Sequence, residues 1–160
     1  MEQIIKQSIA LRGEGKYEES RILLKKMLQD KAYAAKANLH IAWTFDNEGK
    51  ETEAIKHYKL ALKGPISSEE RFETMFGLAS TYRSLGDYEL ALGYFDKTLI
   101  SFPEAIEVKP FYAMCLYNLG RHKEAVSLLL ELLINTINAN TIKDYQKAIR
   151  LYAADLDKTW

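Results

Sequence analysis

Four glycines recur at a nearly constant interval, and this spacing restricts the fold more than any other feature of the chain. They are Gly15, Gly49, Gly86 and Gly120, at intervals of 34, 37 and 34 residues. Each is followed five positions later by a small residue: Ser20, Ala54, Ala91 and Ala125. A fixed period of this length is typical of repeat architectures. The three extra residues of the middle interval fall in segment 64–68, where an insertion costs little.

Each glycine lies between two amphipathic helical patterns. Upstream of Gly86, apolar residues recur with helical spacing at Met75, Leu78, Ala79 and Tyr82. Downstream, the pattern continues at Ala91, Phe95 and Leu99. Glycine adopts a left-handed turn without a Cβ clash, and the small residue lets the second helix approach the first. We therefore expect four helical hairpins, with Tyr17, Tyr58, Phe95 and Leu129 packed in the core.

These residues resemble the tetratricopeptide repeat (TPR) pattern, W-x2-L-G-x2-Y followed by A-x3-F and P. The third copy matches best, with Met75-x2-Leu78-Ala79-x2-Tyr82, Ala91-x3-Phe95 and Pro103. The chain is also similar to small, poorly characterised bacterial TPR proteins. The resemblance implies an all-α fold, a right-handed α-solenoid of four TPR helix-turn-helix hairpins plus a C-terminal capping helix.

The predicted organisation is a single TPR domain over residues 1–160. The expected repeats cover about 1–34, 35–68, 69–105 and 106–137, and the capping helix covers about 141–157. Pro110 lacks an amide hydrogen, so the first helix of the fourth repeat is expected to start late or to kink there. Trp160, at the end of the chain, either packs back or frays.

Because a helix turns by about 100° per residue, one side of each first helix faces away from its partner helix. The resemblance implies that this side lines a concave groove that binds a partner protein or peptide. The predicted groove residues are Leu39, His40, Trp43, Asn47, Phe76, Ser80, Arg83, Phe111, Met114, Tyr117 and Asn118. For Trp43, groove contact and internal packing are equally compatible with the sequence. Packing is the favoured alternative for Phe76 and Phe111.

Some TPR proteins clamp the C-terminal carboxylate of a chaperone tail with Lys, Asn and Arg. Across repeats one to three, the matching positions hold Ile5, Ile9, His40, Glu73 and Gly77. Across repeats two to four, they hold Leu39, Trp43, Gly77, Glu107 and Phe111. Neither set supplies a cation, so a carboxylate clamp of this kind is disfavoured.

Composition argues against several other classes of function. Lys+Arg and Asp+Glu each number 22, which argues against nucleic-acid binding because that requires a basic surplus. No apolar run is long enough to span a membrane, so we expect no membrane association and a cytoplasmic location. The single cysteine, Cys115, excludes an internal disulfide and is expected to be a buried small hydrophobe.

No catalytic or metal-binding motif stands out. His40, His57 and His122 are isolated, with no metal-ligand spacing, and there is no phosphate-binding glycine loop. His40 is expected to be exposed or hydrogen-bonded, and Ser67 with Glu70 forms a plausible capping box. We therefore predict no enzyme activity, no cofactor and no metal.

Two functions fit these observations. The favoured one is a non-enzymatic protein–protein interaction scaffold that binds a peptide or helix of a partner in its aromatic-rich groove. The alternative is a self-associating homo-oligomer that buries the apolar face or the terminal helix. RNA binding by helical repeats is disfavoured by the balanced charge.

Overall fold

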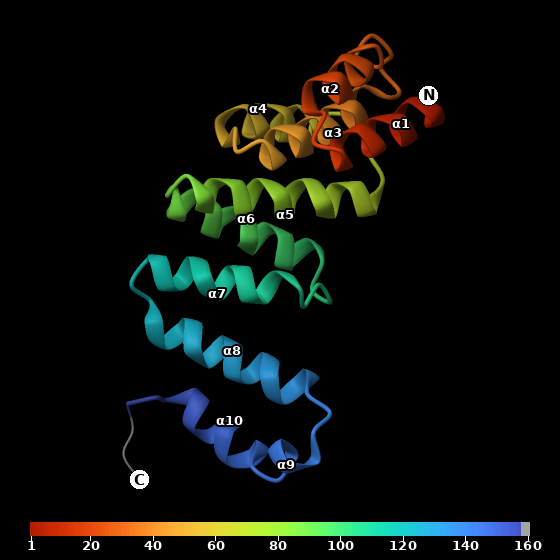
Figure 1. Cartoon of the computed structure of the whole chain (residues 1–160). Helices are drawn as coiled ribbons and strands as arrows, with labels where there is room; N and C mark the ends of the chain where they lie inside the picture. The colour runs from red at the N-terminus through yellow and green to blue at the C-terminus, as the bar shows by residue number, and fades with distance from the viewer. Residues whose placement is uncertain (158–160) are drawn as a thin grey trace. The chain divides into compact units, whose positions relative to one another are not determined.

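The computed structural model describes residues 1–157, and all secondary structure in this range is helical (Figure 1). The hairpins pair α1 (Glu2–Gly13) with α2 (Tyr17–Lys25), α3 (Ala34–Asn47) with α4 (Glu51–Ala61), α5 (Ser68–Ser84) with α6 (Tyr88–Ser101), and α7 (Val108–Asn118) with α8 (His122–Thr136). The chain continues through α9 (Asn140–Lys143) and α10 (Gln146–Ala154). The predicted all-α class is confirmed. Trp160 lies outside the described residues.

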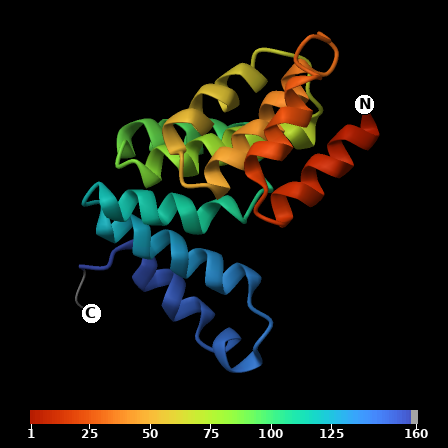
Figure 2. The same ribbon diagram turned by 45° about the horizontal axis from the view of Figure 1, so that its top comes forward.

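The chain forms two compact units, which are described separately. The N-terminal unit covers Met1–Thr98, and the C-terminal unit begins at Leu99, in the last turn of α6. In the N-terminal unit, α3 contacts α1, α2, α4 and α5 (Figure 2). In the C-terminal unit, α8 packs against α7 and α10.

The turn glycines have the backbone conformation that the sequence predicted. Their φ angles are +75° for Gly15, +71° for Gly49, +85° for Gly86 and +75° for Gly120. Each glycine N–H donates to the carbonyl three residues earlier, at Arg12, Asp46, Arg83 and Tyr117, over 3.0–3.1 Å. The turns therefore repeat the same hydrogen bond, because glycine tolerates the left-handed conformation that ends each first helix.

Small residues lie where the two helices of each hairpin meet. The residues seven positions before and five after the turn glycine are buried in every hairpin: Ser8 and Ser20, Ala42 and Ala54, Ala79 and Ala91, Ala113 and Ala125. In the first hairpin, the Ser20 hydroxyl donates to the Ser8 carbonyl over 2.8 Å. A larger side chain at these positions would separate the helices and leave poorly packed space.

The predicted core is confirmed in part. Tyr58 and Phe95 are 1% and 0% exposed, and Tyr17 is half-buried. Leu129 is 43% exposed, so its assignment to the core was wrong. The reason is the position of α10, which contacts a different side of α8: the Ser127 hydroxyl donates to the Ala153 carbonyl over 2.6 Å.

The connection before α5 contains the predicted capping box. The Ser67 hydroxyl accepts from the Glu70 N–H, and the Glu70 carboxylate accepts from the Ser67 N–H. Glu70 also forms an ion pair with Lys36 of α3 over 2.9 Å. The longer interval between Gly49 and Gly86 is therefore accommodated by a well-defined helix start.

Two further expectations concern the C-terminal unit. α7 begins at Val108, two residues before Pro110, so the proline lies in the first turn, where its missing N–H costs no helical hydrogen bond. α7 has 11 residues, compared with 17 in α5. The predicted capping helix is divided into α9 and α10, and Gln146 at the start of α10 donates to the Ile134 carbonyl over 2.9 Å.

Candidate functional site

Trp43 lies at the centre of the predicted site in the N-terminal unit. The indole is half-buried between two basic side chains. The guanidinium carbon of Arg12, from α1, lies 5.0 Å from the centre of the indole, within the range of a cation–π contact. The His40 ring meets the indole edge-on, with ring centres 4.9 Å apart and planes at 85°. Packing therefore holds one side of Trp43 and leaves part of the indole exposed.

His40 is buried rather than exposed or hydrogen-bonded as predicted. Its side chain is 6% exposed, and its Nδ1 is buried with no hydrogen-bond partner among residues 1–157. Burial, reinforced by the positive charges of Arg12 and Lys36, lowers the pKa of His40 to about 4. The imidazole is thus neutral near physiological pH, and it adds no positive charge to the face around Trp43.

The other predicted residues of α3 differ in accessibility. Leu39 is 0% exposed, so like His40 it offers no surface to a partner in this conformation. Asn47 is exposed at the end of α3. Helical periodicity placed Leu39 on the outer side, but α3 contacts helices on several sides, which explains its burial.

On α5, the predicted residues are half-buried. The Phe76 ring packs near Phe72 and Phe95, with ring centres 5.8 Å and 6.3 Å away, in agreement with the packing alternative. Ser80 and Arg83 are also partly accessible. The Arg83 Nε is buried and has no hydrogen-bond partner within the described part of the chain.

A polar junction between α3, α4 and α5 was missed by the sequence reasoning. The Tyr58 hydroxyl donates to Asp46 Oδ2, and the Thr81 hydroxyl lies 3.1 Å from Asp46 Oδ1. Burial raises the pKa of Asp46, although both hydrogen bonds oppose this shift. Gly77 makes room for the phenol, because a Cβ at that position would lie 2.6 Å from the Tyr58 hydroxyl oxygen. The acidic residue three positions before Gly49 was the available signal.

Arg12 was also missed, although one helical turn separates it from Ile9 on the same face. The residue three positions before the turn glycine is structurally equivalent in every hairpin, because its carbonyl accepts from the N–H of that glycine. These residues are Arg12, Asp46, Arg83 and Tyr117. In the N-terminal unit, the side chain at this position is positive in α1 (Arg12), negative in α3 (Asp46) and positive again in α5 (Arg83).

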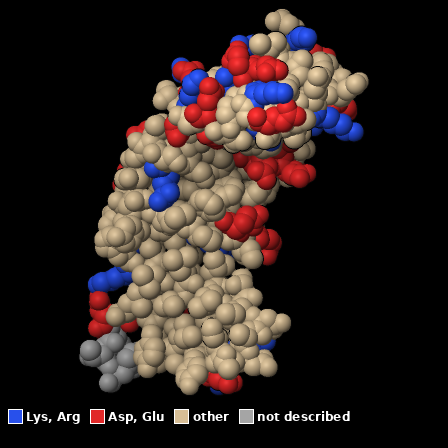
Figure 3. All heavy atoms as spheres, viewed as in Figure 1, with Lys and Arg blue, Asp and Glu red and all other residues tan. Residues whose placement is uncertain are grey.

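In the C-terminal unit, the predicted residues lie together on α7 and are exposed. The exposed fractions are 38% for Phe111, 39% for Met114 and 63% for Tyr117, and Asn118 is exposed beside them. The Tyr117 ring lies 4.7 Å from that of His122. Over this unit, Figure 3 shows a surface in which charged side chains are sparse.

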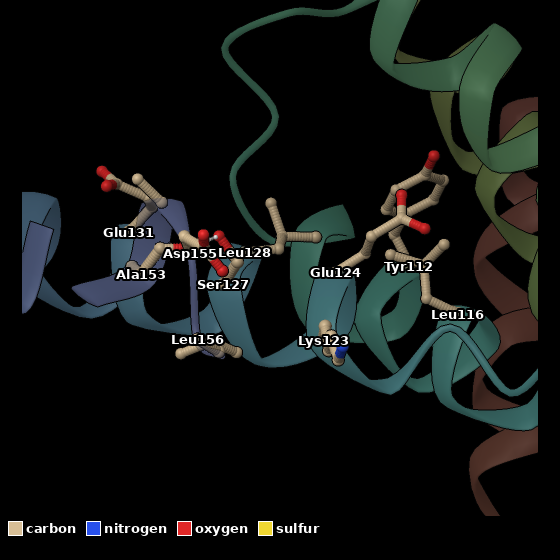
Figure 4. A pocket seen from close by; sticks show the side chains of 11 residues that line it. Tyr112, Leu116, Lys123, Glu124, Ser127, Leu128, Glu131, Ala153, Asp155 and Leu156 are labelled. Atoms are coloured by element: carbon tan, nitrogen blue, oxygen red, sulfur yellow. Dashed lines mark hydrogen bonds between the residues drawn. The ribbon is translucent and has the colours of Figure 1, made fainter. Parts of the chain in front are cut away.

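A cavity of about 500 Å³ lies in the C-terminal unit and contains none of the predicted groove residues. It is lined by side chains of α7, α8 and the end of α10, including Tyr112, Leu116, Leu128 and Leu156 (Figure 4). Lys123, Glu124 and Asp155 contribute charged groups to the lining.

Comparison with known proteins assigns the family. Residues 35–156 match the family described as Tetratrico peptide repeat. The chain belongs to the tetratricopeptide repeat family. Two curated relatives are similar over 74 residues: the Photosystem I assembly protein Ycf3 of Synechococcus sp. (strain CC9605), at 35% identity, and that of Prochlorococcus marinus, at 34%. The match covers 46% of this chain and 39% of either relative.

Membership of the tetratricopeptide repeat family gives the chain a general role in protein interaction. Among residues 1–157, no three His, Cys, Asp or Glu side chains are grouped as metal ligands would be. Cys115 is buried, as predicted. Within residues 1–157, no helix combines the length and the apolar character that are needed to cross a bilayer.

Proposed function

We propose that this TPR protein is a non-enzymatic scaffold that holds a segment of a partner protein against the outer sides of its first helices. The observation that carries this proposal is the partly exposed indole of Trp43, held in place by Arg12 and His40. A rigid, amphipathic aromatic side chain contributes contact area at small entropic cost. The exposed Phe111, Met114 and Tyr117 provide a second contact surface in the C-terminal unit.

Polar residues beside these aromatic side chains support a directional interaction. Asn47 and Asn118 are exposed at the ends of α3 and α7, and Ser80 is partly accessible on α5. An amide side chain both donates and accepts, so it is suited to the backbone of a bound segment. The apolar contacts would supply most of the affinity, and the amides would determine the register.

The names of the curated relatives agree with this role, since both are described as assembly proteins. We place the scaffold in the cytoplasm, where a single buried thiol stays reduced. In this proposal the partner is a protein, and neither a metal nor a cofactor takes part.

The test compares affinity purification with the full chain and with Trp43→Ala. Proteins that bind the proposed face should be recovered with the wild-type chain and be depleted with Trp43→Ala. The matched control is Lys63→Ala, which removes an exposed side chain from the turn after α4. Circular dichroism verifies that both variants fold. Equal recovery with all three baits would show that Trp43 is not part of the binding site.

The alternative function is self-association through the C-terminal unit. Its supporting observation is an exposed stripe on α8 formed by Val126, Leu129 and Leu133, which are 45%, 43% and 38% exposed. Apolar stripes of this kind commonly mark interfaces. Sedimentation velocity at micromolar concentration should then show a dimer that Leu129→Glu dissociates. A monomer in the wild-type chain would exclude this alternative.

A further inference from the structure

Arg12 and Arg83 occupy the same position in their hairpins, three residues before the turn glycine. Both side chains are partly buried. Burial lowers the pKa of Arg12, which indicates that its charge has lost part of its hydration. Arginine at such a position normally has an anionic partner, because an uncompensated, partly buried charge is costly.

Neither side chain has that partner within residues 1–157. Arg12 contacts the face of Trp43 and makes no ion pair or hydrogen bond with a described side chain. The Arg83 Nε is buried and unpaired. Arg21, in α2, provides an internal comparison: its guanidinium binds Glu18 over 2.7 Å and Glu48 over 2.6 Å. The same fold thus supplies carboxylates for one buried arginine and leaves Arg12 and Arg83 without them.

The residue between the two arginines limits the kind of anion that fits. Asp46 holds the equivalent position in the second hairpin, and Tyr58 and Thr81 already use its carboxylate oxygens. A continuous polyanion, such as a nucleic-acid backbone, would place negative charge next to Asp46. A protein segment can instead place acidic side chains at the arginines and a neutral one between them.

We propose that the partner of the N-terminal unit is an acidic protein segment whose carboxylates pair with Arg12 and Arg83 and whose intervening apolar side chain contacts Trp43. This inference rests on the proposed function and specifies the chemistry of its partner. Guanidinium groups bind carboxylates with two parallel hydrogen bonds, which adds geometric selectivity. Ile9, which is 43% exposed beside Arg12 on α1, extends the apolar contact.

The spacing of the two acidic residues follows from the helix stacking. Neighbouring packed helices lie about 8–10 Å apart and an extended chain advances about 3.4 Å per residue, so two helix steps correspond to about five or six residues. The expected segment therefore has two Asp or Glu residues at about this separation, with an aliphatic or aromatic residue between them.

The experiment selects random dodecapeptides displayed on phage against the immobilised full-length chain. The baits are the wild type, Arg12→Gln, Arg83→Gln and the control Lys63→Gln, which removes an exposed charge in the turn after α4. Circular dichroism verifies folding of every bait. Wild type and Lys63→Gln should enrich peptides with paired acidic residues, and both arginine variants should lose this enrichment. For a selected peptide made synthetically, each arginine variant should weaken binding by about tenfold.

Other outcomes contradict the inference in distinguishable ways. Apolar peptides without acidic residues, selected by wild type and lost with Trp43→Ala, would overturn the acidic partner and retain the proposed function. Acidic peptides that bind the arginine variants as well as wild type would assign them to another surface. Displacement of the peptide by oligouridine at equal charge concentration would overturn the assignment to a protein partner. No enrichment over an unrelated bait would overturn both proposals.

Discussion

Ionisable side chains that are buried or half-buried in the N-terminal unit are compensated to very different degrees. Arg21 is 3% exposed, and its charge is matched by Glu18 and Glu48. Asp46 has hydrogen bonds from Tyr58 and Thr81. His40 has an unpaired Nδ1 and avoids the cost of a buried charge by remaining neutral. These differences determine how each residue responds to pH or substitution.

His40 should make the free energy of unfolding depend on pH. Its pKa is lowered from 6.5 to about 4 in the folded chain. The stability associated with the neutral ring is therefore complete above pH 6.5 and is lost as the pH falls toward 4. Between about pH 7 and about pH 5, the wild type should lose about 2 kcal/mol more than His40→Gln in urea unfolding. The comparison cancels the carboxylates common to both proteins. Parallel pH profiles would contradict this explanation.

Tyr58→Phe should destabilise the junction between α3, α4 and α5. Removing the hydroxyl takes one donor from the partly buried Asp46 carboxylate, and leaving a buried polar group unsatisfied costs about 1–3 kcal/mol. Tyr17→Phe is the matched control, because the Tyr17 hydroxyl makes no hydrogen bond to another described residue. Urea denaturation measures both variants. Equal stability of the two would show that the Asp46 contact contributes little.

At the scale of the helix, the hairpins were predictable because their determinants are local. Gly86 at positive φ and the small Ala91 specify one turn and one close helix contact, and the same pattern occurs in each hairpin. The burial of His40 and the exposure of Leu129 depend instead on contacts with distant helices. Single-helix periodicity contains no information about such contacts, so it placed these two residues incorrectly.

Two helical glycines should respond in opposite directions to substitution by alanine. Gly77→Ala places a Cβ 2.6 Å from the buried Tyr58 hydroxyl, so it should destabilise the protein by about 1–3 kcal/mol. Gly93 in α6 has no neighbouring atom within 4 Å of the added Cβ. Gly93→Ala should therefore stabilise the chain by about 0.5–1 kcal/mol through helix propensity alone. Thermal unfolding of the pair measures the difference, and a shift of the same sign in both would contradict the packing argument.

At the scale of the whole molecule, burial is distributed unevenly between the units. The largest fully buried side chains include Tyr58, Phe95 and Leu24 in the N-terminal unit, whereas Val108 and Cys115 represent the C-terminal unit. In helical repeat arrays each repeat is stabilised mainly by its neighbours, so local burial should govern local stability.

Hydrogen exchange should therefore be slower in α3 than in α10. Eight residues of α3 are buried, compared with Ala153 alone in α10. Exchange measured by mass spectrometry should differ by at least about tenfold between these helices, since local opening free energies follow burial. Uniform protection along residues 1–157 would instead indicate that the chain opens as one cooperative block.

The complete burial of Cys115 has a practical consequence for spectroscopy. Maleimide dyes react with accessible thiolates, so the native protein should remain unlabelled under mild conditions. One engineered surface cysteine in each unit, for example Lys63→Cys with Lys147→Cys, would then carry a donor and an acceptor fluorophore outside the proposed binding face and without removal of the native thiol. Energy transfer between them would report the separation of the turn after α4 from α10 in solution, and its change when a partner is added.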